Sequence, residues 1–332
     1  MIRLLLIEFI HADETAYVDV PAGLRVEGRG MLDALVSDAV EAKDVVPIVL
    51  LCEAATADGC RFAPDVNVLV PDVRCPLMDQ LEVLSDHFDA VLPIVPECDQ
   101  LLPSVARVLA GTESNILLPP TEFIEICSDK LVTWNVLGAA GIPMLESAEV
   151  DSSTAFTDEW VFKDRWGAGC EGIQRGQPTD RNSSGVIRQR WIEAVSVSVG
   201  ILGNGDQTLA LPVARQKIQW KNGRPEYLGG DIPAAVDPFA AQQVERIAQQ
   251  VREFAGHFVG YIGIDFLIET NTRKVFLNEV NPRVCTSYIG YRSVLTANAI
   301  ELMLGVTPLS IATVRPLNVS FDKSGATMVA PT

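Results

Sequence analysis

Two acidic side chains face each other on a predicted β-hairpin near the C-terminus, in the segment IDFLIETNTRKVFLNEVNPR. The turn is centred on Thr272, and pairing that is symmetric about this residue places Asp265 opposite Glu279, with Cβ atoms about 5 Å apart. Asn281 lies two residues beyond Glu279 and therefore on the same face of the strand. Opposed carboxylates repel each other, whereas hard divalent cations prefer oxygen ligands. The hairpin therefore predicts a Mg²⁺ site, with nucleotide phosphates nearby to complete the coordination.

A solvated hairpin face is the alternative for any single acidic pair, because acidic side chains usually lie on the surface. We expect Leu267, Val275 and Leu277 to flank the two carboxylates on the same face, which would partly bury them. A cation, Arg283, follows directly after the acidic residues. These neighbours favour the metal site over the solvated face.

A second candidate is the segment WVFKDRWGAGCEGI, in which Lys163 lies in an apolar strand. A buried ammonium group needs an anionic partner. Gly167, Gly169 and Gly172 follow in GxGxxG spacing, but further Gly and Pro residues prevent the helix that a dinucleotide fold requires next. The backbone N–H groups of such a loop can instead cover phosphates. On the glycines alone, an ordinary flexible loop is an equal alternative, and Lys163 favours the phosphate site.

The elements that must position these residues follow from the alternation of apolar runs and amphipathic stretches. Residues 1–118 predict an α/β domain with a parallel sheet, and the proline pair at 119–120 marks its boundary. Helices are expected over 128–138, with Ser128 as the N-cap, and over 239–258. We expect residues 313–332 to form an irregular, loosely held tail.

Composition limits the function classes. The chain has 332 residues, 48% of them hydrophobic and 21% charged, which is typical of a globular protein. Its net charge of −17 disfavours nucleic acid and anionic membranes as partners, although a local cluster of cations can still bind a small anion. Seven scattered cysteines without a CxxC pair suit reduced thiols, and the apolar start is interrupted by Glu8, so we expect a cytoplasmic protein without a signal peptide.

Four segments resemble the motifs of ATP-grasp enzymes, in the same order. SDKLVTWNVLGAAGIPM resembles the helix that opens their nucleotide-binding part, and VFKDRWGAGCEGI resembles their strand and phosphate loop. VIRQRWI resembles the hinge that binds adenine, and GIDFLIE with FLNEVNPR resembles their metal-binding strands. The resemblance implies an α/β plus α+β fold of the ATP-grasp type. Its expected parts are an N-terminal domain at 1–118, a small lobe at 119–200, a large lobe with the metal hairpin at 201–312, and the tail.

The resemblance also implies roles, position by position. The ATP-binding residues it implies are Lys130, Lys163, Gly167, Gly169, Gly172, Gln189, Trp191, Ile192 and Ser196. Asp265, Glu279 and Asn281 would hold two Mg²⁺ ions, with Mn²⁺ as an alternative metal. Arg283 would neutralise an acyl phosphate, and Lys217 would add to the phosphate clamp.

Two further stretches, LRVEGRGML and NEVNPRVCTSYIGYR, resemble carboxylate–amine ligases that join glutamate to tyramine or tyrosine in methanofuran and methylofuran biosynthesis. This resemblance implies an ADP-forming ligase that makes an amide bond through an acyl phosphate from a small carboxylate and a small amine. Arg215 and Arg292 would hold the second carboxylate of glutamate, and Tyr288 would contact the amine, with core packing as the alternative for the tyrosine. A homodimer is compatible with this reading.

Three departures from the pattern leave another function open. Ser196 stands where many relatives have an acidic residue for the ribose, Ala194 replaces a hinge glycine, and Gly263 replaces an arginine. The alternative is a catalytically silent ATP-binding sensor or scaffold with the same fold. A nicotinamide oxidoreductase rests on the glycine spacing alone and is disfavoured by the missing helix.

Overall fold

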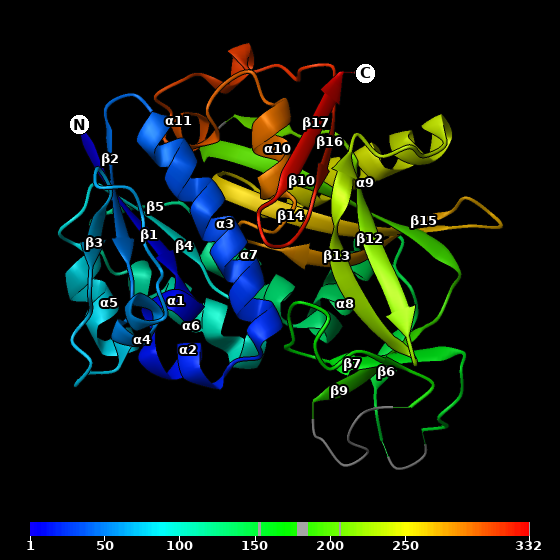
Figure 1. Ribbon diagram of the computed structural model, residues 1–332. Helices are drawn as coiled ribbons and strands as arrows, with labels where there is room; N and C mark the ends of the chain where they lie inside the picture. The colour runs from blue at the N-terminus through cyan, green and yellow to red at the C-terminus, as the bar shows by residue number, and fades with distance from the viewer. Residues whose placement is uncertain (152–153, 178–184, 206, 332) are drawn as a thin grey trace.

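The computed structural model describes residues 1–151, 154–177, 185–205 and 207–331. Its N-terminal part is a five-stranded parallel sheet with strand order β3-β2-β1-β4-β5 (Figure 1). The strands are β1 Ile2–Glu8, β2 Val45–Leu50, β3 Asn67–Leu69, β4 Ala90–Ile94 and β5 Asn115–Ile116. The helices are α1 Phe9–Ala12, α2 Glu14–Asp19, α3 Ala22–Glu41, α4 Glu53–Ala57, α5 Leu77–Ser85 and α6 Leu101–Leu109, with a 3₁₀ turn, η1, at Cys98–Gln100.

The continuous apolar run of β1 reflects a sheet that is covered on both faces. Leu4 and Leu6 pack in the core that contains α3, whereas Leu5 and Ile7 pack in a separate core with α5 and α6. The parallel sheet of the predicted fold is therefore confirmed.

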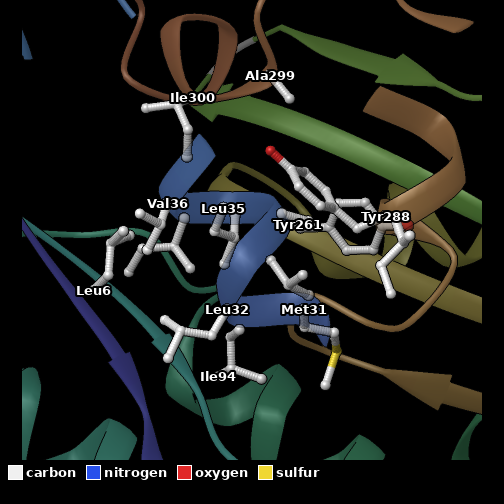
Figure 2. Close-up of a cluster of buried hydrophobic side chains, with 14 of the residues drawn as sticks. Leu6, Met31, Leu32, Leu35, Val36, Ile94, Tyr261, Tyr288, Ala299 and Ile300 are labelled. Atoms are coloured by element: carbon white, nitrogen blue, oxygen red, sulfur yellow. The ribbon is translucent and has the colours of Figure 1, made fainter. Parts of the chain in front are cut away.

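Helix α3 joins the N-terminal sheet to the C-terminal half of the molecule. Figure 2 shows Leu6 and Ile94 of the sheet on one side of this helix and Tyr261 and Tyr288 of the C-terminal half on the other. At Gly30 the approach is so close that a Cβ would lie 2.6 Å from the carbonyl oxygen of Lys323. Residues on α3 can therefore contact both the N-terminal sheet and the C-terminal half.

A small antiparallel sheet with strand order β6-β9-β7-β8 follows. Its strands are β6 Ser147–Glu149, β7 Trp160–Asp164, β8 Gln174–Arg175 and β9 Val186–Arg190, preceded by helices α7 Thr121–Ser128 and α8 Lys130–Ala139. The helix expected from Ser128 is wrong in its start. Asp129 separates α7 from α8, and its side chain accepts the N–H groups of Leu131 and Val132, so Asp129 rather than Ser128 is the cap.

The largest sheet has eight antiparallel strands in the order β15-β14-β10-β12-β13-β16-β17, with β11 paired to β10. They are β10 Ala194–Gly205, β11 Thr208–Ala210, β12 Ala214–Lys221, β13 Arg224–Ile232, β14 Phe258–Glu269, β15 Val275–Asn281, β16 Leu317–Phe321 and β17 Thr327–Pro331. The helices of this part are α9 Pro238–Ala255, α10 Tyr288–Val294 and α11 Ala299–Met303, with a 3₁₀ turn, η2, at Leu309–Ile311. Helix α9 packs Val244, Ile247 and Val251 into the core under β14 and β15.

Two of the expected boundaries differ from the structure. The lobe boundary expected at residue 200 falls inside β10, which belongs to the large sheet from Ala194 onward. The tail expected to be irregular contains the β16–β17 hairpin, because Val319 and Phe321 alternate into the core and β16 pairs with the edge of β13. Among the described residues, no helix has the length and apolar character needed to cross a bilayer.

Candidate active site

A cavity of about 290 Å³, the main cavity, lies between the small sheet and the large sheet. Strands β7, β9, β10, β12, β14 and β15 contribute to its wall, together with the segment 190–193 that connects the two sheets. Of the residues predicted from sequence, those that line it are Lys163, Gly169, Gln189, Trp191, Ile192, Ser196, Asp265, Glu279, Asn281 and Arg283. The structure therefore brings together side chains that are up to 120 residues apart in the sequence, from Lys163 to Arg283.

The metal hairpin has the predicted pairing at its centre, since Asp265 lies opposite Glu279. The symmetric register does not continue, because Asn278 is an extra residue that bulges from β15 between its paired neighbours. The expectation that Val275 and Leu277 share the carboxylate face is wrong for this reason. Both side chains pack in the core beneath α9, on the opposite face of the sheet.

Asp265 is held by two amide groups. Gln216 Nε2 donates to Asp265 Oδ1 at 2.9 Å, and Asn281 Nδ2 donates to Asp265 Oδ2 at 3.2 Å. Burial, and then the charge of Glu279, raise the pKa of Asp265 to about 7, although both amide donors oppose the shift. At neutral pH, Asp265 is therefore only partly ionised as long as no metal cation is bound beside it.

Two lysines face the acidic pair. Lys130 Nζ lies 3.1 Å from Glu279 Oε1 and also donates to the carbonyl oxygen of Gly167. Lys163 is almost completely buried, and its Nζ donates to Gln189 Oε1 at 3.1 Å. Burial is the main cause that lowers the pKa of Lys163 to about 8; the charge of Glu279 opposes the shift and the charge of Lys130 adds to it. Burial would raise the pKa of Glu279, but the two lysines outweigh it and the net shift is downward.

Two glycines of the loop after β7 adopt backbone conformations that other residues rarely adopt. Gly169 and Gly172 have φ values of +67° and +70°, which L side chains rarely adopt. A Cβ on Gly169 would lie 2.5 Å from Leu24 Cδ2 of α3, and one on Gly172 would overlap the carboxylate of Asp164. The loop therefore lies against the N-terminal domain, where its backbone can approach a ligand in the cavity.

The segment between the two sheets supplies the aromatic part of the wall. Trp191 and Trp220 meet edge to face with centroids 4.8 Å apart, and the guanidinium of Arg175 lies 4.3 Å from the Trp191 ring. The backbone N–H of Trp191 donates to the carbonyl oxygen of Glu159, so it is engaged within the protein. Ile192 offers a second backbone position in the same wall.

Arg283 is bound by a residue that the sequence did not point to. Its Nε donates to Glu97 Oε1 at 2.9 Å and its Nη2 to Glu97 Oε2 at 2.7 Å. Both side chains are nearly buried. Burial would lower the pKa of Arg283, but the ion pair with Glu97 raises it above its ordinary value.

Lys217 and Arg215 are not brought to the main cavity. Lys217 Nζ lies 2.6 Å from Asp231 Oδ1 and donates to Ser320 Oγ at 2.8 Å, since the bulge in β12 turns this side chain toward β13 and β16. Arg215 is exposed and does not line the cavity. Their predicted contacts with phosphate and substrate do not fit these positions.

Arg292 and Tyr288 are also placed elsewhere. Both bind Asp38 of α3, with Arg292 Nη2 at 2.6 Å from Asp38 Oδ1 and the Tyr288 hydroxyl at 2.6 Å from Asp38 Oδ2. Tyr288 is fully buried. The core-packing alternative for the tyrosine is therefore the correct one, and this group ties α10 to α3 rather than binding substrate.

Three cavity or near-cavity residues were missed from sequence: Gln216, Glu97 and Glu27. Glu27 lies on α3 and accepts a hydrogen bond from the hydroxyl of Thr286, which follows the metal hairpin. The available signal was a carboxylate beside Gly28 in the LRVEGRGML segment, but nothing local to that segment predicts a partner in the C-terminal half.

The donor set of the hairpin fits a hard cation. Asp265, Glu279 and Asn281 present two carboxylates and an amide, the oxygen groups that Mg²⁺ accepts. No group of three or more His, Cys, Asp or Glu side chains in the described ranges is arranged to hold a metal by itself. A bound Mg²⁺ would therefore need further oxygens from phosphates and water.

Residues 127–287, just under half of the chain, match the family described as ATP-grasp domain. The curated relatives include D-alanine–D-alanine ligase of Prochlorococcus marinus (strain MIT 9215), which is 24% identical over 115 residues, 33% of this chain and 31% of that protein. The chain spans less than a third of the length of the curated relatives it matches.

Solved structures are similar over nearly the whole chain. An ATP-grasp superfamily protein from Archaeoglobus fulgidus has a TM-score of 0.73 at 21% identity, covering 96% of this chain and 92% of that one. The biotin carboxylase domain of 2-oxoglutarate carboxylase from Hydrogenobacter thermophilus, solved with MgADP, ADP and bicarbonate, has a TM-score of 0.70 at 13% identity, covering 96% and 73%. The predicted fold class, ATP-grasp with an N-terminal parallel sheet, is confirmed.

Proposed function

We propose that this chain, which carries an ATP-grasp domain, is an ADP-forming ligase that binds Mg-ATP in the main cavity and joins a carboxylate to an amine. The observation that carries the proposal is the convergence of Lys130 and Lys163 on the acidic hairpin of Asp265 and Glu279. Lys163 lines the main cavity together with both carboxylates, and Lys130 reaches the same place through its ion pair with Glu279. Such a group of cations and carboxylates suits phosphates and their metal.

The site suggests a position for each part of the nucleotide. The purine would lie along the segment 190–193, beside the Trp191–Trp220 pair, and the phosphates would lie under the glycine loop between Lys130 and Lys163. Asp265, Glu279 and Asn281 would hold Mg²⁺, which when bound neutralises phosphate charge. That the H. thermophilus domain was solved with MgADP supports this arrangement.

The chain's own groups suit phosphoryl transfer. An oxygen of the substrate carboxylate attacks the γ-phosphorus of ATP, ADP leaves, and the product is an acyl phosphate. An amine then attacks the carbonyl carbon, inorganic phosphate leaves, and the nitrogen loses a proton to give the amide. Lys163 and Arg283 are cationic groups fixed by buried partners, so they would stabilise the charge that develops in both steps.

Isothermal titration with ATP and MgCl₂ tests the nucleotide half of the proposal. We expect binding in the wild-type protein and a loss of at least about 30-fold in affinity in Lys163→Met, which removes a charge-assisted contact. The matched control is Lys221→Met, since Lys221 pairs with Glu226 on the surface of β12 and β13. Absence of ATP binding at millimolar concentration in the wild-type protein would falsify the proposal.

A narrower proposal concerns the substrates. The two segments that resemble glutamate–tyramine and glutamate–tyrosine ligases support these substrates, and the D-alanine–D-alanine ligase relative supports an amino-acid carboxylate. The positions of Arg215, Arg292 and Tyr288 add no support. ADP release measured with glutamate and either tyramine or tyrosine, each omitted in turn, tests it. Turnover that requires none of these three compounds would keep the ligase and discard these substrates.

A nucleotide sensor or scaffold remains the second proposal, because Glu97 occupies both arms of the Arg283 guanidinium and Gly263 leaves no arginine in its place. A phosphate-release assay with a panel of amino acids and amines separates the two functions. A sensor binds ATP without releasing phosphate under any of these conditions.

A further inference from the structure

A second cavity of about 450 Å³ adjoins the main cavity. The residues that line both are Glu27, Gly169, Cys170, Ile173, Pro225 and Tyr227. The second cavity opens between α3, the glycine loop and β13, on the side of the loop that faces the N-terminal domain. A molecule in it would therefore approach the phosphate end of the main cavity from the side of α3.

Glu27 stands where the two cavities meet. A Cβ on Gly169 would lie 3.8 Å from Glu27 Oε2, and the other carboxylate oxygen accepts the hydroxyl of Thr286. In the described part of the chain no ion pair to Glu27 is found, whereas Arg283, the cation that lines the main cavity beside Thr286, is already paired with Glu97. The carboxylate is thus partly solvent-accessible, fixed by one neutral donor, and placed beside the phosphate site.

The proposed reaction requires an amine close to the phosphate end of the main cavity. An amine cosubstrate arrives at neutral pH as an ammonium ion and must reach the acyl phosphate without passing the bound nucleotide. Leu24, Ile173, Pro225 and Tyr227 form an apolar part of the wall of the second cavity. The charged residues of its wall are four carboxylates and two cations, so the cavity is acidic on balance: Glu27, Asp164, Glu171, Glu226, Arg224 and Lys323. A carboxylate at the neck of a cavity that is acidic on balance and has an apolar part of its wall matches a molecule with one cationic end and an apolar body.

We propose that Glu27 binds the ammonium group of the amine cosubstrate, a primary amine with an apolar body that occupies the second cavity. This inference rests on the proposed ligase function and assigns the entry side and the recognition group of one substrate. Lys323, on the β16–β17 turn, also lines the second cavity, so a purely structural pairing of Glu27 with this lysine is the competing explanation.

The test compares two probes of nearly equal shape, phenethylamine and 2-phenylethanol, of which only the first carries a charge at pH 7. Each is titrated calorimetrically into the full chain with MgCl₂ and a non-hydrolysable ATP analogue. We expect the wild-type protein to bind phenethylamine about tenfold more tightly than the alcohol, the size of one charge-assisted hydrogen bond. Glu27→Gln, which keeps an acceptor for Thr286, should remove this preference, and Glu27→Asp should retain it.

Glu41→Gln is the matched control, because it removes the same charge from the exposed end of α3, away from both cavities. We expect it to keep the wild-type preference. No preference for the amine in the wild-type protein, or a preference that survives in Glu27→Gln, overturns the inference. Nucleotide binding in the same experiment is scored separately, so that loss of ATP affinity counts against the proposed function and loss of amine preference counts against Glu27 alone.

Discussion

Glu97 of the N-terminal domain accepts two hydrogen bonds from Arg283, which follows the metal hairpin. Arg283 Nε donates to Glu97 Oε1 at 2.9 Å, and Arg283 Nη2 donates to Glu97 Oε2 at 2.7 Å. Glu97 follows β4 and Arg283 follows β15, so the pair joins the end of the parallel sheet to the wall of the main cavity. Both side chains are nearly buried, so removal of either one would leave the other as an uncompensated buried charge. The cavity is therefore completed by the N-terminal domain.

Glu97→Gln is expected to lower turnover at least about tenfold while ATP affinity changes little, because Arg283 loses its fixed orientation but the lysines and the hairpin remain. Removal of one partner from a buried ion pair should also reduce the free energy of unfolding by about 3 kcal/mol. Urea denaturation measures the second effect. The double variant Glu97→Gln/Arg283→Gln should be destabilised by less than the sum of the single variants, and strict additivity would contradict the coupling.

Glu279→Gln keeps the shape of the side chain but removes a charge that faces Lys130 and the metal site. Turnover should fall about 10³-fold with the fold retained, since the contact acts on charge in the transition state. ADP release with excess MgCl₂ and circular dichroism measure the two properties. Glu269→Gln, at the far end of the same hairpin, is the control and should behave as the wild type. Near-normal turnover in Glu279→Gln would show that the hairpin does not hold the metal.

ATP affinity should weaken as pH rises through about 8. Lys163 is charged in the free protein below its pKa of about 8 and loses its proton above it, whereas an ordinary lysine would keep its charge over this range. Binding of ATP above this pKa must take up a proton, so the dissociation constant should increase by up to about tenfold per pH unit. Calorimetry in buffers of different ionisation enthalpy measures the uptake. Lys163→Met should bind weakly at every pH without this rise.

Gly172→Ala should destabilise the protein by at least about 1 kcal/mol, because a Cβ at a φ of +70° is strained and would overlap Asp164. Thermal unfolding measures the loss, and Asp164→Ala in the same chain should recover the part that comes from the overlap. Gly138→Ala is the opposite control. Gly138 lies inside α8 with open space around it, so alanine there should stabilise the helix by about 0.5–1 kcal/mol. Equal effects at both glycines would contradict the argument.

The parts of the site that could be predicted are those that depend on short-range geometry. Asp265 and Glu279 lie close together because they are on the two strands of one hairpin with a five-residue connection. Their direct opposition, however, depends on the bulge, since the pairs next to the turn, such as Ile268 with Val275, are offset by one residue from the predicted register. Lys163 follows three apolar residues in its strand. The bulge at Asn278 could not be predicted, because one extra residue leaves the hydrophobic pattern of the strand ends unchanged while it moves Val275 and Leu277 to the other face.

The residues that were misplaced or missed depend on how the N-terminal domain docks. Glu27 and Glu97 reach the cavities only because α3 and the segment after β4 pack against the C-terminal half. The same docking takes Tyr288 and Arg292 away from the cavity, since Asp38 of α3 binds both. The hydrophobic periodicity of a helix shows which face is buried but not which distant element covers that face. These contacts therefore could not be predicted from the spacing of motifs.

The close approach of Gly30 to the β16–β17 turn means that α3 packs against residues that are synthesised long after it. The residues that cover the second face of α3, from Tyr261 and Tyr288 to the turn at Lys323, follow Met31 and Gly30 of the helix by about 230 to 290 residues and are synthesised after it. The parallel sheet can form early, as N-terminal domains do. Until those residues have been synthesised, the face of α3 that they cover lacks its native partners, so its final packing is reached only after β16 and β17 have emerged.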